Sequence, residues 1–377
     1  MGALSSFTAP QLGALVVREA VERAGLAPEE IDEVIMGQVV QAGTGQNPAR
    51  QTALDAGLPP SVAALTLNKV CGSSLKAVVL ATQAIKLGDA DRIIAGGQES
   101  ASNGPYLLPK ARTGYRLGHG KLLDATVHDG LWDAFNDYHM GCTGEVVADR
   151  FEVTRDEQDA WSYRSHARAN AAADAGEFDA EILAVTVPQR RGDPVVVSRD
   201  EPIRADTTVE ALGKLRPVFD PEGSVTAGNA PGVNDGASAV CVMSDEEAAQ
   251  RGIEPLARVV AYATSGLEPE LVMMAPVQAV EMVLAKTGWD RADVDLYELN
   301  EAFAVQSVAV VRELGIDAER VNVRGGAVAI GHPIGASGTR ILTTLLHAMR
   351  DRGARRGIAA MCLGGGNAVA MAVEREN

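Results

Sequence analysis

Apolar residues in the first hundred positions alternate between helical spacing and short runs. Over residues 10–24 and 75–87 they recur every three or four positions, and each stretch ends at a glycine, which predicts two amphipathic helices. The stretches at 31–36, 63–70 and 92–97 are short and mostly apolar, which predicts buried strands. This alternation of strand and helix predicts an α/β fold with a largely parallel sheet.

The same pattern recurs near the other end of the chain. Three segments have counterparts: 25–35 with 288–297, 71–75 plus its helix with 332–339 plus its helix, and 93–98 with 358–365. The first and last pairs are separated by 263 and 265 residues. We therefore predict two similar α/β halves, each of which places one reactive residue at the start of an equivalent helix.

The segment between the halves has a different character. Its beginning is rich in Gly, Pro, Lys and Arg, residues 143–175 are predicted to be helical, and its end is rich in Pro, Asp and Arg. We assign residues 1–102 with 228–247 to the N-terminal half, 103–227 to an inserted loop domain, and 248–377 to the C-terminal half. Insertions of this kind usually carry ligand or subunit contacts.

Size and charge limit the classes of function. The 377 residues exceed the ~250–300 that a single core accommodates, which agrees with two packed units. The net charge of −16 makes sequence-independent binding to nucleic acid or to an anionic membrane surface unfavourable. An anionic ligand would need a local basic site or a helix N-terminus.

Cysteine usage and the absence of targeting signals indicate a compartment. The four cysteines, at 71, 142, 241 and 362, form no C-x-x-C pair, which argues against a disulfide framework or a zinc site and for a reducing setting. We find no apolar run of the ~18 residues that a membrane span needs, and no secretory or transit signal at the start. We expect a cytoplasmic protein that binds neither metal nor membrane.

Two residues at predicted helix starts can carry chemistry. Cys71 precedes a Gly-Ser-Ser helix start, where the helix N-terminus lowers a thiol pKa and offers N–H groups to an anion. The alternative is a small buried core cysteine. His332 lies between Gly331 and Pro333, which force a tight turn and hold the imidazole rigidly. The alternative is a surface histidine.

Two further motifs follow predicted strands. Cys362 precedes three glycines, 364–366, whose N–H groups can approach a ligand closely and form an oxyanion site. The alternative is a buried cysteine before a turn. Asn300 opens the sequence Asn-Glu-Ala-Phe before a helix, where its amide either caps the helix or orients a water or a histidine.

Together, the motifs Cys71-Gly-Ser, Asn300-Glu-Ala-Phe, Gly331-His-Pro and Cys362-Leu-Gly on a duplicated α/β chain resemble thiolases, from about Leu4 to the C-terminus. The segment that ends in His139-Met140 resembles the biosynthetic, acetoacetyl-CoA-forming branch. The resemblance implies duplicated βαβαβαββ halves, packed as a five-layered α-β-α-β-α core with an inserted loop domain.

The resemblance also implies a mechanism without a cofactor. Cys71 would be acylated by one acetyl-CoA, with His332 taking the thiol proton, and Cys362 would remove an α-proton from a second acetyl-CoA. The condensation gives acetoacetyl-CoA and CoA, and the reverse reaction is thiolysis. A water held by Asn300, with His332, would form one oxyanion site, and the N–H groups of Cys71 and Gly364 the second.

Further positions match the CoA-binding residues of thiolases. Arg204 falls where the family places an arginine beside the adenine, and the others match the pantetheine tunnel: Leu131, His139, Met140, Ala227, Pro231, Ala302 and Phe303. A solvated arginine and ordinary core residues are the alternatives. The basic loop 110–121 matches the segment through which biosynthetic thiolases form homotetramers, and its alternative is a mobile exposed loop.

The chain departs from the family pattern at several positions. Thiolases of this type carry the first strand of the N-terminal sheet before the point where this chain begins, so we expect that strand to be missing. Ser74 replaces a glycine, and Pro231 replaces a serine that contacts pantetheine, losing a hydroxyl and an N–H. Residues 272–275 replace a Met-Gly-x-Gly stretch, which bears on acyl-chain tolerance, and Asn367-Ala368 replaces Gln-Gly.

Three alternatives to a short-chain thiolase remain open. A 3-ketoacyl-CoA thiolase of fatty-acid degradation would accept longer chains. A decarboxylating condensing enzyme would use His or Asn partners in place of a second cysteine, which Cys362 opposes. A non-catalytic acyl-CoA- or lipid-binding relative would be expected to have lost one of the four motif residues.

Overall fold

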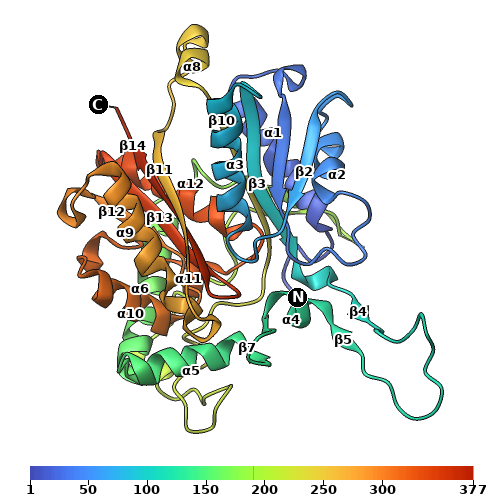
Figure 1. Cartoon of the computed structure of the whole chain (residues 1–377), viewed down its shortest axis with the longest axis vertical. Coiled ribbons are helices and arrows are strands. Elements are labelled where there is room, and N and C mark those ends of the chain that lie inside the picture. Colours follow the sequence, from blue (N-terminus) through green and yellow to red (C-terminus); the bar gives the residue numbers. More distant parts are fainter. Residues whose placement is uncertain (190, 377) are drawn as a thin grey trace.

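Two four-stranded sheets form the frame of the computed structural model, which describes residues 1–189 and 191–376 (Figure 1). The N-terminal sheet has the order β10 (Asp235–Met243), β3 (Arg92–Ser100), β1 (Glu33–Gly37), β2 (Ala63–Leu67). The C-terminal sheet has the order β11 (Arg258–Gly266), β14 (Asn367–Glu374), β13 (Arg356–Leu363), β12 (Leu296–Leu299). β1 is parallel to β2 and β3, and β12 to β13, whereas β10, β11 and β14 pair antiparallel with their neighbours.

Helices form the other three layers. α3 (Ser73–Leu87) and α12 (Ser337–Arg352) lie between the sheets and share an apolar core with strands of both. α1 (Ala9–Arg23) and α2 (Pro48–Asp55) cover the outer face of the N-terminal sheet. α9 (Ala275–Thr287) and α10 (Ala304–Leu314) cover that of the C-terminal sheet. The predicted five-layered α-β-α-β-α arrangement is confirmed.

The internal duplication is visible in the elements themselves. α3 and α12 begin 264 residues apart, and so do β3 and β13. α3 ends at Gly88 and α12 at Gly353, both in the left-handed conformation that glycine adopts without strain. The halves therefore present the starts of equivalent helices to each other.

The inserted segment contains short elements and one sharp break. A protruding loop joins β4 to β5, and further short elements lead to helices that pack on the C-terminal half: β4 (Tyr106–Leu107), β5 (Leu123–Asp124), α4 (Ala125–Gly130), β6 (Trp132–Asp133), β7 (Tyr138–His139), α5 (Met140–Arg150), α6 (Arg155–Asp174), β8 (Val185–Val187), β9 (Val195–Val197) and α7 (Val209–Leu212). The stretch 143–175 that was predicted to be helical contains two helices, α5 and α6, with a break over residues 151–154. Glu152 takes a positive φ, and Thr154 with Glu157 forms a capping box that starts α6.

The remaining elements are short. They are α8 (Asp245–Arg251), α11 (Ala327–Ile330) and the 3-10 helices Pro28–Glu30, Ala101–Asn103, Pro269–Met274, Arg291–Asp293 and Ala318–Arg320.

The stretch Val70–Leu87 is longer and more apolar than we expected from the sequence. By length and composition alone, Val70–Leu87 could cross a membrane, which corrects the expectation that no such run exists. Half of that stretch is buried within the fold, because it contains α3, the helix between the two sheets. Its apolar character is accounted for by the core that it helps to form.

The two sheets differ at one edge. In the C-terminal half, β14 is covered by β11, whereas the equivalent edge of β10 pairs with no strand of residues 1–189 and 191–376.

The central helices approach each other most closely at their starts. The Ser74 hydroxyl accepts a hydrogen bond from the Thr339 N–H at 2.9 Å, so the serine that replaces a family glycine joins α3 to α12. A methyl group added at Gly338 would overlap the backbone nitrogen of Leu75. This crossing fixes the relative positions of Cys71 and His332, which lie just before the two helices.

We predict that Gly338→Ala lowers the free energy of unfolding by about 2 kcal/mol, because the methyl group overpacks a rigid helix crossing. Urea denaturation followed by circular dichroism measures the effect. Gly213→Ala is the matched control, since its added methyl group meets no atom nearer than 3.4 Å. Equal stability of the two variants would contradict the close approach.

Candidate active site

Cys71 lies in a turn that its neighbours hold in place. The Ser73 hydroxyl donates to the Val70 carbonyl at 2.6 Å and accepts from the Lys69 N–H at 2.8 Å. Val70 itself takes a positive φ of 46°. The partly buried Cys71 side chain packs against an apolar cluster that includes Val40 and Ile334. The turn therefore sets the thiol at the N-terminus of α3.

The electrostatics of Cys71 differ from the expectation. Burial raises the pKa of its thiol to about 12, and the Glu99 carboxylate adds to the rise. The N–H groups of Cys71 and Gly364 at the sulfur lower the pKa, but they do not offset burial. N–H groups at the sulfur therefore lower the pKa in the predicted direction, but burial outweighs them and the net shift is upward. The two N–H groups nevertheless converge where an oxyanion on an acylated Cys71 would need them.

Cys362 is the second thiol of the site. It lies near the end of β13, is only 4% exposed, and packs in the core of the C-terminal half. Burial raises the pKa of its thiol well above the usual range, and the second cause is Cys71. The structure therefore brings both sequence-predicted cysteines to one place and keeps both as neutral thiols.

His332 is buried and held by hydrogen bonds on two sides. Its Nδ1 lies 2.6 Å from the Ser337 hydroxyl, which donates to the Pro333 carbonyl at 2.9 Å. This network assigns the ring proton to Nδ1 and leaves the Nε2 lone pair free. The His332 N–H also donates to Asn234 Oδ1 at 2.9 Å. Burial lowers the pKa of the imidazole to about 3, and Arg340 contributes, so the ring is neutral at pH 7.

Three buried polar atoms of the site have no partner among the residues that the structure describes. They are Nε2 of His332 and both side-chain polar atoms of Asn300. Asn300 follows β12, and its backbone N–H donates to the Ala360 carbonyl. Because buried polar groups are normally paired, these atoms are suited to bind a substrate oxygen or a water.

A small cavity of about 120 Å³ adjoins His332. Its lining includes six sequence-predicted residues: Leu131, His139, Pro231, Ala302, Phe303 and His332. The His139 ring stacks on Phe219 with centroids 4.7 Å apart, and its Nδ1 accepts from the Gly141 N–H at 3.0 Å. Burial lowers the pKa of His139, so this ring also stays neutral.

Three of the predicted CoA-binding residues lie outside this cavity lining, and so do the catalytic candidates Cys71, Asn300, Cys362 and Gly364. Met140 packs against the core of the C-terminal half, and Ala227 is exposed. Arg204 is also exposed and lines a larger groove instead. The structure thus gives no support for grouping Arg204 or Ala227 with the cavity.

The chain matches known families along its length. The family model "Thiolase, N-terminal domain" matches residues 1–246, and "Thiolase, C-terminal domain" matches residues 253–375. The chain belongs to the thiolase family.

Individual relatives of this thiolase are similar over nearly their full length. An acetyl-CoA acetyltransferase of Pseudomonas aeruginosa is 55% identical over 375 residues, covering 100% of this chain and 95% of the relative. A probable acetyl-CoA acetyltransferase of Escherichia coli is 52% identical, with the same coverage. The crystal structure of the Bacillus anthracis acetyl-CoA acetyltransferase superposes with a TM-score of 0.97 at 44% identity, covering 99% of this chain and 94% of that one.

Sequence reasoning missed two buried carboxylates that support the site of this thiolase. Glu99 accepts from the N–H groups of Val39 (3.0 Å), Val40 (3.1 Å) and Gly335 (3.0 Å), so it ties the His332 turn to the N-terminal half. Burial raises its pKa to about 7, against the effect of these three donors. The sequence offered one sign of Glu99, because this charged residue lies in a strand whose neighbouring positions are buried.

The second carboxylate, Glu301, holds the segment that contains Asn300. It accepts from Trp161 Nε1 at 2.9 Å, the Ser165 hydroxyl at 2.7 Å, Asn322 Nδ2 at 3.0 Å and the Val328 N–H at 3.0 Å. All four donors lie elsewhere in the chain. The sequence offered one sign of Glu301, because this residue lies between Asn300 and Ala302 in the motif Asn300-Glu-Ala-Phe.

We predict that alkylation of Cys71 in the substrate-free thiolase rises about tenfold per pH unit between about pH 7 and about pH 10, because only the thiolate reacts. The pKa of about 12 means that the thiolate fraction is still rising throughout this range. Mass spectrometry of the Cys71 peptide after iodoacetamide treatment measures the rate, with glutathione as the reference thiol. The raised pKa would be contradicted if the alkylation rate of Cys71 levelled off at the same pH as that of glutathione, or at a lower pH.

Proposed function

We propose that the protein is an acetyl-CoA C-acetyltransferase that joins two acetyl-CoA molecules to acetoacetyl-CoA and CoA, and also catalyses the reverse thiolysis. One observation carries the proposal: two neutral thiols lie close enough for each to feel the other's charge, Cys71, which accepts from the Gly364 N–H, and Cys362, in a chain that also holds a neutral His332 with a free Nε2. The names of the similar proteins support the choice of substrate.

In the first half-reaction, the Cys71 sulfur attacks the thioester carbonyl of acetyl-CoA. Its proton passes to His332 Nε2, which the Ser337 contact leaves unprotonated. The oxygen of the tetrahedral intermediate accepts from the N–H groups of Cys71 and Gly364. The intermediate collapses to acetyl-Cys71, and the departing CoA sulfur takes up the proton from His332.

In the second half-reaction, Cys362 passes its thiol proton to His332 Nε2, and the resulting thiolate removes an α-proton from another acetyl-CoA. The enolate oxygen is stabilised by His332 and by a water on the Asn300 amide, the groups whose buried polar atoms are free. The enolate carbon attacks the acetyl carbonyl, and the bond to the Cys71 sulfur breaks. The Cys71 thiolate then takes the proton from His332, which restores both thiols and the neutral imidazole. The sequence of steps needs only CoA thioesters, with no metal or redox cofactor.

Burial accounts for the order of events in this scheme. Both thiols and the imidazole are held in their neutral forms, so proton transfer from a thiol is unfavourable until a bound thioester takes up the developing charge. The thiols are thereby protected from reaction in the absence of substrate.

The names of the similar proteins favour a short acyl group. The cavity of about 120 Å³ beside His332 is small, and its lining includes neither Cys71 nor Cys362. The stretch 272–275 replaces a family Met-Gly-x-Gly stretch and was expected to alter the tolerated acyl-chain length. Its residues 272–274 are buried in the core of the C-terminal half and do not line this cavity.

For assembly we propose a cytoplasmic homotetramer, with contacts through loop 110–121. The loop projects from the body between β4 and β5 (Figure 1). Leu117 at its tip is fully exposed, and Leu122 next to it is 62% exposed. Exposed apolar side chains on a protruding loop are typical of subunit contacts.

The test of the function is thiolysis of acetoacetyl-CoA by the purified chain, with Cys71→Ala as the control. We expect thiolysis that the control lacks entirely. A series of 3-ketoacyl-CoA substrates of increasing length should show falling rates. Rates that rise with chain length would replace the proposal with a 3-ketoacyl-CoA thiolase, and a folded chain inactive on every member would indicate a non-catalytic relative.

We predict that Cys362→Ala still forms acetyl-Cys71 from acetyl-CoA, but lowers the condensation rate by about 10³-fold, because the general base is lost. Mass spectrometry detects the acetylated chain, and the release of CoA during acetoacetyl-CoA formation gives the rate. A condensation rate equal to that of the parent chain would show that Cys362 is not the general base.

A further inference from the structure

Glu99 is a buried carboxylate beside both reactive groups of the first half-reaction, although the mechanism above gives it no step. Its side chain is 0% exposed and lines the same small cavity as His332. Its charge also acts on the Cys71 thiol. Because a buried carboxylate is costly to keep, a carboxylate at this place indicates a role in the site.

The hydrogen bonds of Glu99 join two segments that are far apart in the sequence. Oε2 accepts from the N–H groups of Val39 and Gly335, both at 3.0 Å, and Oε1 accepts from the Val40 N–H at 3.1 Å. Val39 and Val40 follow β1, whereas Gly335 lies between His332 and the start of α12. One side chain therefore binds the His332 turn to the N-terminal half.

The turn approaches Glu99 as closely as a backbone can. A methyl group added at Gly335 would lie 2.8 Å from Glu99 Oε2 and 2.8 Å from the Gln98 carbonyl oxygen, which is nearer than real Cβ contacts. Only glycine fits at this position without a shift. The contact therefore depends on both partners, the carboxylate of Glu99 and the missing side chain of Gly335.

The segments that Glu99 binds also form the surroundings of the nucleophile. Val39, Val40 and Ile334 belong to one apolar cluster, and the Cys71 side chain packs against it. Ile334 directly precedes Gly335, and His332 lies two residues before Ile334. A shift of this turn would thus change the position of the imidazole relative to the Cys71 sulfur.

We propose that Glu99 is a positioning residue for the acyl transfer: its carboxylate binds the turn 331–335 to residues 39–40, and so holds His332 Nε2 where it takes the proton of Cys71. This inference rests on the proposed function, because it concerns one proton transfer of that reaction. Glu99 acts through the turn and takes up no proton from the substrate.

The proposal has a consequence for pH dependence. Only the ionised carboxylate can accept from all three N–H groups, because protonation turns one oxygen into a donor. Burial raises the pKa of Glu99 to about 7, and Asp235 of β10 adds to the rise. The three contacts are therefore complete above about pH 7 and are weakened as the pH falls through it. The pKa values of His332, about 3, and Cys71, about 12, lie far from this range.

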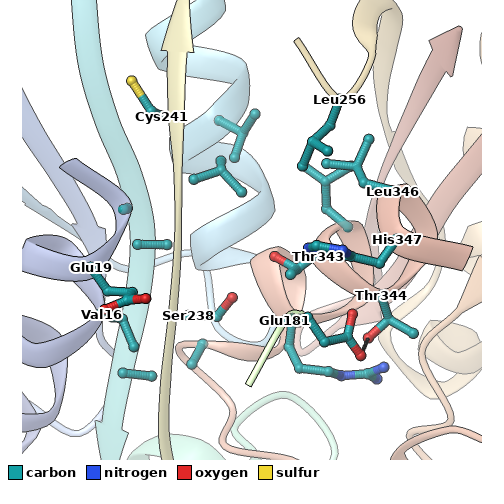
Figure 2. A pocket seen from close by; sticks show the side chains of 18 of the residues that line it. Val16, Glu19, Glu181, Ser238, Cys241, Leu256, Thr343, Thr344, Leu346 and His347 are labelled. Carbon is teal, nitrogen blue, oxygen red and sulfur yellow. Dashed lines mark hydrogen bonds between the residues drawn. The ribbon is translucent and has the colours of Figure 1, made fainter. Parts of the chain in front are cut away.

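Three other buried carboxylates titrate in the same range. Burial raises the pKa of Asp200 to about 6, of Glu181 to about 7 and of Glu298 to about 8. Asp200 and Glu181 line a separate groove of about 1730 Å³, where Figure 2 shows Glu181 beside Thr344 of α12. Glu298 lies 3.1 Å from Arg340. Since none of the three lines the small cavity of the site, a substitution at position 99 separates their effects from that of Glu99.

The test is the rate at which acetyl-CoA acetylates Cys71, measured by rapid quenching and mass spectrometry between about pH 5.5 and about pH 9. For the parent chain we expect a rate that rises through about pH 7 and then levels off. Glu99→Gln keeps the shape of the side chain but turns an NH2 group toward a backbone N–H. We expect it to lower the rate at pH 8 by about 10- to 100-fold, because the imidazole is displaced, and to remove the inflection near pH 7.

Glu145→Gln is the matched control. The Glu145 carboxylate also accepts three hydrogen bonds, from the Ser224 N–H at 2.8 Å, the Ser224 hydroxyl at 2.9 Å and the Val225 N–H at 2.8 Å. It lies in α5 and does not line the small cavity of the site. This variant should keep the inflection of the parent chain, because Glu99 is intact.

Alkylation of Cys71 by iodoacetamide gives a second readout that does not depend on acetyl-CoA. Loss of the Glu99 charge lowers the pKa of the Cys71 thiol, so Glu99→Gln should be alkylated at least about threefold faster at pH 8. Acetylation and alkylation of the same sulfur therefore change in opposite directions. A Glu99→Gln chain that is acetylated at the parent rate, with the parent inflection, would overturn the proposal.

The parent chain itself covers the case of a variant that does not fold. The amide resonances of Val39, Val40 and Gly335 should shift together with a midpoint near pH 7, since one carboxylate binds all three N–H groups. Amide resonances that do not titrate would overturn the proposal. A parent chain that acetyl-CoA leaves unmodified at every pH would instead overturn the proposed function, and this inference with it.

Discussion

The close approach of two backbones at the centre of the molecule determines the geometry of the site. A methyl group added at Gly97 would overlap the Gly335 carbonyl, and one at Gly338 would overlap α3, so side chains larger than hydrogen are excluded from both positions. This contact places the start of α3 against the start of α12. Cys71 and His332 are therefore positioned by a contact between the halves, in addition to the local turns that hold each of them.

Burial that follows from this contact also sets the chemistry. In the middle of five layers, the thiols and the imidazole lose hydration, which favours their neutral forms. The polar groups that remain available are N–H groups and free lone pairs, and these stabilise charge that develops during a reaction. Glu99 follows the same trend, because burial raises its pKa to about 7 although three backbone N–H groups bind its carboxylate.

Much of the fold could be predicted from local patterns. The helix that became α3 was bounded by its apolar spacing and by Gly88, and the duplication predicted its partner α12. The break between α5 and α6 was missed, because a capping box inside a helical composition is a weak signal. The motif residues were found from their Gly and Pro neighbours, which shape turns whatever the distant context is.

Other features could not be read from the sequence because they depend on distant segments. The pKa of Cys71 is set by desolvation from both halves, which outweighs the local effect of a helix N-terminus. Arg204 was placed by analogy alone, and its exposed position beside the groove reflects the path of the insertion. The support from Glu301 involves Trp161 and Asn322, which no local pattern relates to it.

The hydrogen bonds of Glu301 have a consequence for folding cooperativity. Its donors Trp161 and Ser165 belong to α6 of the insertion, whereas Asn322 and Val328 belong to the C-terminal half. Removing α6 would leave a buried carboxylate without two of its donors, at a cost comparable to a large share of a domain's stability. We therefore expect the insertion and the C-terminal half to unfold as one unit, although the sequence divides them into two.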